Sequence, residues 1–204
     1  MPARTVLQQA DITRALTRIS HEILESVREG DRLVILGIPT RGTVLAERIA
    51  AIIRSVSDQP VDVGTLDVTM YRDDLDRNPT RTPAPTQMPD GGIDGSVVVL
   101  VDDVLYSGRT IRAALDALQA IGRPRYVRLA TLVDRGHREL PIRPDFVGKN
   151  LPSSRSERIN VHLAEIDGDE FVSIDGPRID GPRTDGPPLD GPPLDGPEQN
   201  GALA

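Results

Sequence analysis

Apolar residues recur at intervals of three and four between residues 10 and 28, which is the spacing of one helix face. The pattern predicts an amphipathic helix over this stretch. A short apolar run at residues 33–38 contains Gly37 and is followed by Pro39, which is typical of a strand buried on both faces. A second helix is predicted next. The inward positions of the two helices are Ile12, Leu16, Ile19, Ile23 and Val27, then Leu45, Ile49, Ile52 and Ile53.

The same alternation continues along the chain. Residues 97–101 and 127–133 predict two more buried strands, and the helix between them ends near Gly122 and Pro124. Strands that alternate with helices in this way predict an α/β fold, with a mostly parallel, doubly wound sheet flanked by helices. The apolar positions of this third helix are Ile111, Leu115, Leu118 and Ile121. Extended pieces near Phe146, at 159–163 and at 171–174 are expected to add strands at an edge of the sheet.

Two further segments differ from this pattern. Val61, Val63 and Val68 suggest another extended piece, and residues 72–95, rich in Asp, Pro, Thr and Gly, predict a long loop or hairpin. Loops of that length in compact domains are usually functional or disordered.

The chain ends in a five-residue repeat that begins Asp-Gly-Pro. Residues 175–204 hold seven prolines, six glycines, six acids and two arginines, so they carry −4 of the formal charge of −7. Such a segment cannot bury enough surface to order itself, and we expect a disordered acidic tail beside a domain at residues 1–174. An interaction tail is the functional alternative.

Composition excludes several classes of function. The chain has no cysteine, so disulfides, thiolate nucleophiles and Cys-ligated metals are absent, and its three histidines argue against a metal cluster. Five aromatic residues are too few for a base-stacking platform. Because no stretch approaches the ~18 to 20 apolar residues of a membrane span and the start of the chain has no apolar signal region, we expect a soluble, cytoplasmic protein.

The sequence VVLVDDVLYSGRT at residues 98–110 carries the strongest chemical signal. Two adjacent carboxylates, Asp102 and Asp103, come where the predicted strand ends, and Ser107, Gly108 and Thr110 open the next helix. The start of a helix at the carboxyl edge of a parallel sheet favours phosphate, while ionised carboxylates accept hydrogen bonds from sugar hydroxyls. The combination predicts a site for a ribose 5-phosphate group. An acidic helix cap, the structural alternative, would account for Asp103 but not for the whole run.

This run resembles the phosphoribosyl pyrophosphate (PRPP) motif of type I phosphoribosyltransferases. Other segments agree with one branch of them, the PyrR family, whose members regulate pyrimidine operons and resemble uracil phosphoribosyltransferases in activity. The resemblance covers roughly residues 8–174 and stops at the repeat. The matching segments are RALTRISHEI, LGIPTRG, LDVTMYRDDL, LVDRGHRELPIR and VGKNLPSSRSER.

The resemblance implies that uracil and PRPP react to give UMP and pyrophosphate, with Mg²⁺ bound through PRPP and without direct protein ligands. It implies catalytic roles for Asp102, Asp103 and Arg41, and it makes the segment containing Tyr71, Arg72, Asp73, Asp74 and Arg81 a mobile hood over the substrate. Pro39 stands where Lys is common in the family. The implied substrate-binding residues are Thr40, Arg41, Gly42, Arg81, Asp102, Asp103, Val104, Leu105, Tyr106, Ser107, Gly108, Arg109, Thr110, Arg135 and Ile159.

The resemblance also implies RNA binding by a homodimer or higher oligomer. A solvated helix face is the usual explanation for exposed cations such as those of residues 10–28, but PyrR proteins use the matching regions to bind leader mRNA in response to UMP or UTP. We therefore favour a bifunctional protein over a nucleotide sensor with little catalysis, or an enzyme without RNA binding. The implied RNA-binding residues are Arg14, Thr17, Arg18, His21, Arg138, Arg143 and Lys149.

Overall fold

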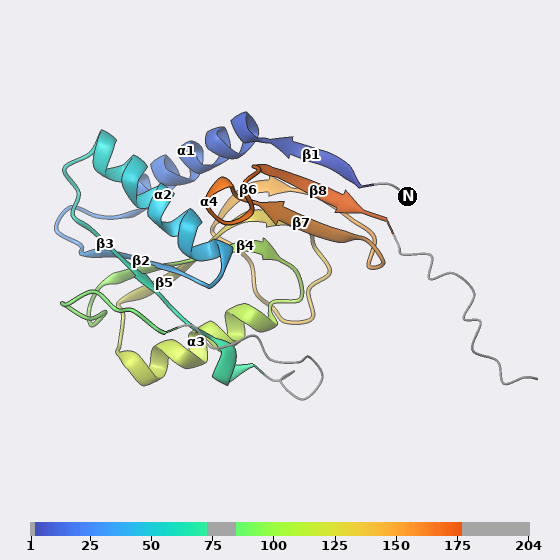
Figure 1. Ribbon diagram of the computed structural model, residues 1–204. Coiled ribbons are helices and arrows are strands. Elements are labelled where there is room, and N and C mark those ends of the chain that lie inside the picture. Colours follow the sequence, from blue (N-terminus) through green and yellow to red (C-terminus); the bar gives the residue numbers. More distant parts are fainter. Residues whose placement is uncertain (1–2, 73–84, 177–204) are drawn as a thin grey trace, which may run out of the picture.

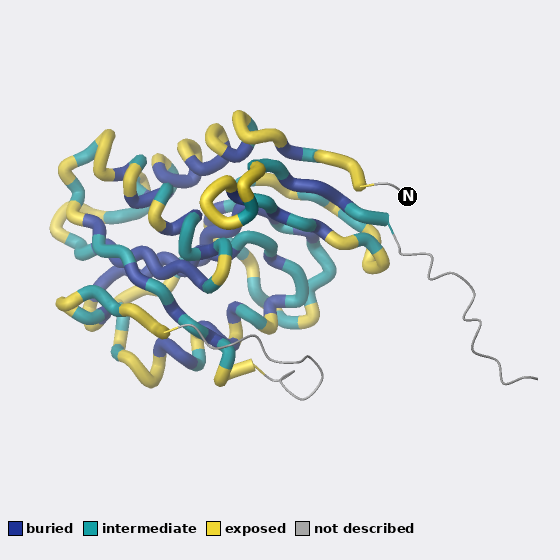
Figure 2. Tube along the Cα trace, in the orientation of Figure 1, coloured by how far each residue is buried: buried dark blue, intermediate teal, exposed yellow. Residues whose placement is uncertain are grey.

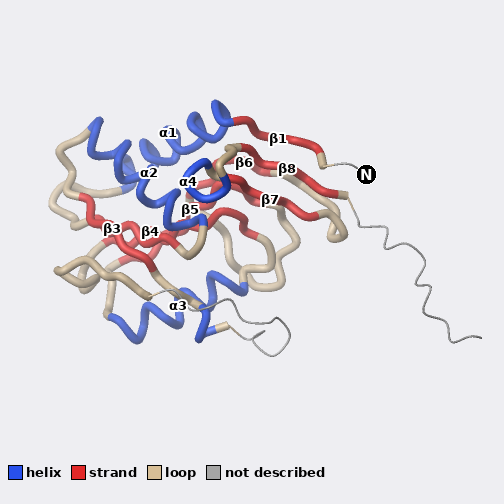
Figure 3. Tube along the Cα trace, in the orientation of Figure 1, coloured by secondary structure: helices blue, strands red, loops and turns tan. Residues whose placement is uncertain are grey.

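A computed structural model describes residues 3–72 and 85–176 of the chain and contains two sheets (Figures 1 and 3). The larger sheet has five parallel strands in the order β3-β2-β4-β5-β6, and the smaller has three antiparallel strands in the order β1-β8-β7. The strands are β1 Arg4–Gln8, β2 Leu33–Gly37, β3 Val61–Thr65, β4 Val97–Leu105, β5 Tyr126–Asp134, β6 Phe146–Asn150, β7 Arg158–His162 and β8 Phe171–Asp175. The helices are α1 Gln9–Ser26, α2 Arg41–Val56, α3 Arg109–Ile121, α4 Ala164–Asp167 and the 3-10 turn η1 Thr69–Tyr71.

Helices cover both faces of the parallel sheet, as the alternation of strands and helices predicted (Figure 1). The apolar core is divided into two clusters by this sheet. One joins α1 and α2 to the sheet through Ile19 and Ile49, and the other joins α3 through Ile111. All five residues of β2 are buried, as the uninterrupted apolar run predicted, and Figure 2 shows the central strands as the most buried part of the chain.

The third helix, α3, packs differently from what the spacing of its apolar residues predicted. Leu115 and Ile121 are 37% and 38% exposed, although the spacing placed them with Ile111 and Leu118 on one face. The helix instead buries three alanines beside Ile111 and Leu118: Ala113, Ala114 and Ala117. Hydrophobicity alone could not reveal this, because small residues allow a helix to lie close to a sheet while leucines on its flank remain partly exposed.

The late strands correct a second expectation. Of the three extended pieces expected at the sheet edge, only β6 joins the parallel sheet. Strand β7 pairs instead with β8, and β8 pairs with β1, a strand that the sequence pattern did not predict. Strand β8 ends at Asp175, next to the predicted domain boundary at 174. The two ends of the domain therefore lie side by side in one small sheet (Figure 1).

Only parts of the predicted long loop are described. Tyr71 ends η1, and after the gap Gln87 exchanges two main-chain hydrogen bonds with Thr65 at 2.8 and 2.9 Å. The predicted hood residues Asp73, Asp74 and Arg81 lie outside the described residues. In the described part of the chain, no helix is both long and apolar enough to cross a membrane.

Candidate active site

The site predicted from the sequence lies at the carboxyl edge of the parallel sheet. Strands β2 and β4 are neighbours and run parallel, with Gly37 opposite Val101. The loops that follow these two strands therefore emerge side by side, which is where open α/β sheets bind ligands. Strand β4 continues to Leu105, four residues beyond the expected end, so Asp102 and Asp103 lie within the strand and not in a turn after it.

The two carboxylates occupy different environments. Asp102 is 8% exposed, whereas Asp103 is half-buried. The Asp103 N–H donates to Oδ1 of Asp102 at 3.0 Å, and the Val104 N–H donates to Oδ1 of Asp103 at 2.9 Å. Burial raises the pKa of the Asp102 carboxyl well above its usual range, and the charge of Asp103 raises it further. The pair thus combines a buried carboxyl group that resists ionisation with a more accessible one.

The loop after β4 turns sharply into α3. Gly108 has a left-handed backbone with φ of 93° and caps the first turn of the helix, a conformation that glycine adopts without strain. A side chain at this position would lie 3.4 Å from Ile142. Ser107 and Thr110 are half-buried, and Arg109 is exposed. The loop therefore presents hydroxyl groups and a helix N-terminus at one place, as phosphate binding requires.

The segment of residues 134–142, here called the brace, supports this loop from one side. The main-chain N–H of Arg135 donates to Leu105 O at 3.1 Å, and those of Glu139 and Leu140 donate to Ser107 O at 3.0 and 3.2 Å. The Glu139 carboxylate also accepts from Nε of Arg109 at 2.8 Å. The loop conformation thus depends on a segment about 30 residues away in the chain.

Arg138 is the central side chain of the brace. Its Nη1 donates to Tyr106 O at 2.9 Å and to Gly136 O at 3.2 Å, and it lies 3.5 Å from Leu105 O. Nε donates to Ile142 O at 2.9 Å, and Nη2 pairs with Asp134 at 2.5 Å. This guanidinium, predicted to contact RNA, is only 21% exposed and uses its donors within the protein.

Arg135 and Tyr106 stack at the predicted base site. The Arg135 guanidinium lies 4.4 Å from the centre of the Tyr106 ring, and the His137 ring meets Tyr106 edge-on. Arg135 is 8% exposed; Nη2 donates to two carbonyls, whereas Nε is buried without a partner in the described structure. A cavity of about 400 Å³ borders this group and is lined by Asp134, Arg135, Gly136, His137, Asn150, Pro152 and Ser153.

The side chain of Ile159, also predicted at the base site, does not line this cavity. It is buried in β7 and packs in the core cluster next to α1 and α2. Strand β7 lies at an edge of the small sheet.

The loop predicted to bind pyrophosphate packs directly against β4. The Ile38 N–H donates to Val101 O at 2.9 Å, and a Cβ on Gly42 would lie 2.4 Å from the same oxygen. Only glycine therefore allows α2 to begin this close to the strand that carries Asp102. Thr40 is exposed at the tip of the loop, where the Pro39–Thr40 peptide bond is cis.

Arg41 is the cation of this loop, and its guanidinium is held by α4. Nη2 lies 2.7 Å from Oδ1 of Asp167, and Nε lies 3.2 Å from Oδ2. The ion pair joins the first residue of α2 to the last residue of α4. Sequence reasoning missed Asp167, because no local pattern connects two residues 126 positions apart.

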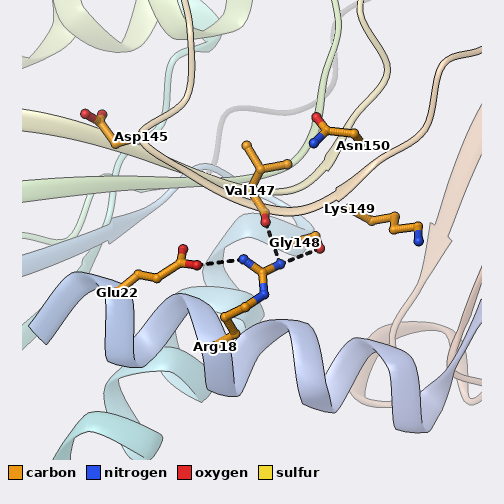
Figure 4. A pocket seen from close by; sticks show the side chains of 7 residues that line it. All are labelled: Arg18, Glu22, Asp145, Val147, Gly148, Lys149 and Asn150. Carbon is orange, nitrogen blue, oxygen red and sulfur yellow. Dashed lines mark hydrogen bonds and ion pairs between the residues drawn. The ribbon is translucent and has the colours of Figure 1, made fainter. Parts of the chain in front are cut away.

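The residues predicted to bind RNA occupy two kinds of environment. Arg14, Thr17, Arg18 and His21 are exposed on α1, and Arg143 and Lys149 are exposed near β6, whereas Arg138 lies in the brace. An open groove of about 550 Å³ runs between α1 and β6, lined by Arg18, Glu22, Asp145, Val147, Gly148, Lys149 and Asn150 (Figure 4). The structure thus gathers part of the predicted set around one groove and separates Arg138 from it.

Arg18 is tied to the edge of the sheet in this groove. Its Nη2 donates to the carbonyls of Val147 and Gly148, both at 2.8 Å, and Nη1 pairs with Glu22 at 2.7 Å (Figure 4). These bonds tie α1 to β6, which is an edge strand of the parallel sheet. Lys149 extends from the same strand away from Arg18 in Figure 4, and it is exposed.

This fold and site define a phosphoribosyltransferase-type protein, and comparisons with known proteins agree. Residues 3–164 match the family described as "Phosphoribosyl transferase domain". The chain is 70% identical over 180 residues to "Bifunctional protein PyrR" of Leifsonia xyli, which covers 86% of this chain and 98% of that protein. It is 61% identical to the Streptomyces coelicolor protein of the same name, over 83% of this chain and 88% of that one. The chain belongs to the PyrR family.

Solved structures support the fold. A hypoxanthine phosphoribosyltransferase from Staphylococcus aureus matches with a TM-score of 0.63 and 17% identity, over 83% of this chain and 90% of that one. A hypoxanthine-guanine phosphoribosyltransferase from Bacillus anthracis matches with the same TM-score and 18% identity, over 83% and 96%. At this level of identity the likeness establishes the fold alone.

Proposed function

We propose that the protein transfers the phosphoribosyl group of PRPP to uracil and releases pyrophosphate. The observation that carries the proposal is the contact between the two loops at the carboxyl edge of the sheet, where Gly42 packs on the backbone of Val101 and Asp102. A ligand that spans both loops would place its ribose beside the acidic pair. PRPP has that layout, with phosphate at one end of the ribose and pyrophosphate at the other.

Different residues of the site bind different parts of PRPP. The loop at 104–110 takes the 5-phosphate through N–H groups, hydroxyls and the helix N-terminus. Asp103 accepts hydrogen bonds from the ribose hydroxyls, and Thr40 and Arg41 hold the pyrophosphate. Positive charge builds up on the ribose as pyrophosphate leaves, and the nearby Asp103 stabilises it while the base is held in line. The transfer reaction needs no nucleophilic side chain.

Mg²⁺ fits this arrangement through PRPP. Asp102 and Asp103 are two carboxylates, and in the described part of the chain no three His, Asp or Glu side chains are grouped to hold a metal ion. Mg²⁺ prefers six oxygen ligands and is commonly held by few carboxylates together with substrate phosphates. When bound with PRPP, the ion would neutralise the departing pyrophosphate. The protein side chains orient the ligand that brings it.

Uracil is the proposed base because of the residue after Leu105. Tyr106 takes the position where purine-specific relatives carry an Asp that accepts a ring proton, and here the tyrosine ring lies against Arg135 and meets His137 edge-on. Polar main-chain and side-chain groups at 134–136 and the main chain of Ile159 would recognise the pyrimidine edge. The alternative is a protein that binds uridine nucleotides as signals with little catalysis.

Substitution of Asp103 tests the enzyme directly. Asp103→Asn should lower the rate of UMP formation from uracil and PRPP at least tenfold, equivalent to about 1.4 kcal/mol. Asp58→Asn is a matched control, because Asp58 is exposed before β3 at the opposite edge of the sheet. A wild-type chain that forms no UMP would leave only the sensor function, and unchanged turnover in Asp103→Asn would remove the ribose assignment.

We also propose a regulatory function in the cytoplasm: binding of the leader mRNA of a pyrimidine operon by a homodimer or higher oligomer, with UMP or UTP controlling affinity. The support is the family membership and the exposed cations around the groove of Figure 4. The test is RNA binding by the wild-type protein with and without UMP. An affinity for leader RNA no greater than that for an unrelated RNA would contradict the regulatory function.

A further inference from the structure

The loop that follows β4 is held by its carbonyl oxygens. Leu105 O accepts from the Arg135 N–H, Tyr106 O from Nη1 of Arg138, and Ser107 O from the N–H groups of Glu139 and Leu140. All of these donors belong to the brace, residues 134–142. Three consecutive carbonyls of the loop therefore point toward the same neighbouring segment.

A trans peptide bond fixes where the N–H groups of this loop point. In a trans peptide the C=O of one residue and the N–H of the next lie on opposite sides of the chain. With the carbonyls of residues 105, 106 and 107 turned to the brace, the N–H groups of residues 106, 107 and 108 are turned away from it. Three successive N–H groups on one side form a concave anion-binding surface. The brace thus determines the direction in which this surface faces.

Arg138 holds the middle peptide of the three. Tyr106 O accepts from this one side chain, whereas the outer two carbonyls accept from main-chain N–H groups that substitution leaves in place. Arg138 is itself fixed by Asp134 and Ile142 O, so it acts as a rigid fork between two parts of the brace and the loop. Arg138 can therefore affect ligand binding through the loop without contacting the ligand.

We propose that Arg138 is a positioning residue that orients the N–H groups of the loop at 106–108 toward the 5-phosphate of PRPP. The inference rests on the proposed function, which assigns the 5-phosphate to this loop. It also gives Arg138 a role different from the direct RNA contact that the family resemblance implied. A weaker RNA affinity of an Arg138 variant would then be a consequence of a changed nucleotide site.

Two inhibitors of PRPP turnover separate the two ends of the site. Ribose 5-phosphate engages the loop at 104–110, and pyrophosphate engages the loop at 38–42. Arg138→Gln should raise the inhibition constant for ribose 5-phosphate at least tenfold and leave that for pyrophosphate within about twofold, so KM for PRPP rises more than kcat falls. A general loss of structure would move both inhibition constants together.

Arg123→Gln is the matched control. Arg123 is exposed in the turn before β5, at the opposite edge of the sheet, and its substitution removes the same charge. Both inhibition constants should equal those of the wild type. Arg138→Lys is the second variant, because an ammonium group keeps the charge but loses the fork that joins Tyr106 O to Asp134. It should show a smaller increase for ribose 5-phosphate alone.

The outcomes separate this inference from the proposed function. If ribose 5-phosphate does not inhibit the wild-type protein, the phosphate assignment itself fails. If it inhibits the wild type and Arg138→Gln equally, or if both inhibition constants rise by the same factor in Arg138→Gln, the positioning role is wrong. If Arg138→Gln does not fold, Arg138→Lys decides, and wild-type constants in that variant overturn the inference.

Discussion

Arg41 and Asp167 form a two-point ion pair that joins the pyrophosphate loop to α4, with Nη2–Oδ1 and Nε–Oδ2 distances of 2.7 and 3.2 Å. Asp167 also accepts from the Leu163 N–H at 2.9 Å. Desolvation opposes ionisation of Asp167, but the hydrogen bonds from Leu163 and Arg41 outweigh it and lower the pKa of the carboxyl. A pyrophosphate bound at this loop would therefore share the Arg41 guanidinium with the Asp167 carboxylate.

The first prediction concerns this shared cation. Arg41→Gln should raise the inhibition constant for pyrophosphate at least tenfold, because it removes the charge-assisted hydrogen bonds of the loop. Asp167→Asn should lower the same constant about two- to threefold, since Arg41 keeps its charge and loses a competing anion. Steady-state inhibition with ribose 5-phosphate as a parallel ligand is the measurement. The inhibition constant for pyrophosphate should shift in opposite directions in the two variants. Shifts in the same direction would contradict a competition between pyrophosphate and Asp167 for Arg41.

A second prediction follows from the buried acid of the PRPP motif. Asp102 keeps its proton to a higher pH in the folded protein than in the unfolded chain, where the pKa of Asp is about 3.9. Ionisation therefore costs folding free energy, and this cost is absent below the unfolded pKa and develops as pH rises through the folded pKa. Asp102→Asn should then exceed the wild type in stability at pH 8, with the difference shrinking toward pH 4.

Urea unfolding at several pH values measures this difference. Asn has the shape of the protonated acid, and its Oδ1 can still accept from the Asp103 N–H. Asp58→Asn, on the exposed turn before β3, should show no such pH dependence. A stability gain of Asp102→Asn that is independent of pH would mean that charge is not its cause.

The third prediction compares the contributions of two exposed arginines of α1 to stability: Arg18, which lines the α1–β6 groove, and Arg14, which does not. Arg18→Gln should lower the free energy of unfolding by about 1 kcal/mol, because two carbonyls of β6 lose their donor. Arg14→Gln should cost less, since it removes an exposed pair with Asp11 one turn away. Chemical denaturation of both variants measures the effect. Equal costs would mean that the contacts of Arg18 with the sheet edge contribute nothing.

The fourth prediction uses the salt dependence of RNA binding. Lys149 is exposed, so a Lys149→Gln variant that loses one phosphate contact should reduce the slope of log K against log salt by about 0.7 to 0.9. Arg138→Gln should leave the slope unchanged, because its donors are used within the protein. Filter-binding titrations at several salt concentrations supply the slopes, with Arg123→Gln as the control. A smaller slope for Arg138→Gln would place that side chain at the RNA.

The last prediction locates the end of the folded domain. Truncation after Gly176 should keep UMP synthesis and leave the melting temperature within about 2 °C, since the repeat has too few apolar residues to add a core. Truncation after Ser173 should destabilise, because it removes Ile174, which is 7% exposed, at about 1.5–3 kcal/mol for burying such a side chain. It also removes Asp175, which accepts from Asn160 at 2.7 Å. Calorimetry of the two truncated chains decides the boundary.

The sequence by itself determined the parallel sheet, its main helices and the acidic pair before a phosphate-type loop. These features depend on local order: apolar runs at 33–38 and 97–101 form buried strands, and the spacing from Ile12 to Ile23 forms one helix face. The motif at 98–110 has its chemistry in consecutive residues, so no tertiary contact was needed to recognise it.

Only the tertiary structure decided which side chains support the site from a distance. Arg138 and Tyr106 are 32 residues apart, and Arg41 and Asp167 are 126 apart, so neither pair leaves a periodic signal. The pairing of β1 with β8 likewise depends on two segments far apart in the sequence meeting, which a five-residue pattern does not encode. An exposed arginine and one bound to main-chain carbonyls look alike in sequence, because the difference lies in what the fold brings within 3 Å of the guanidinium.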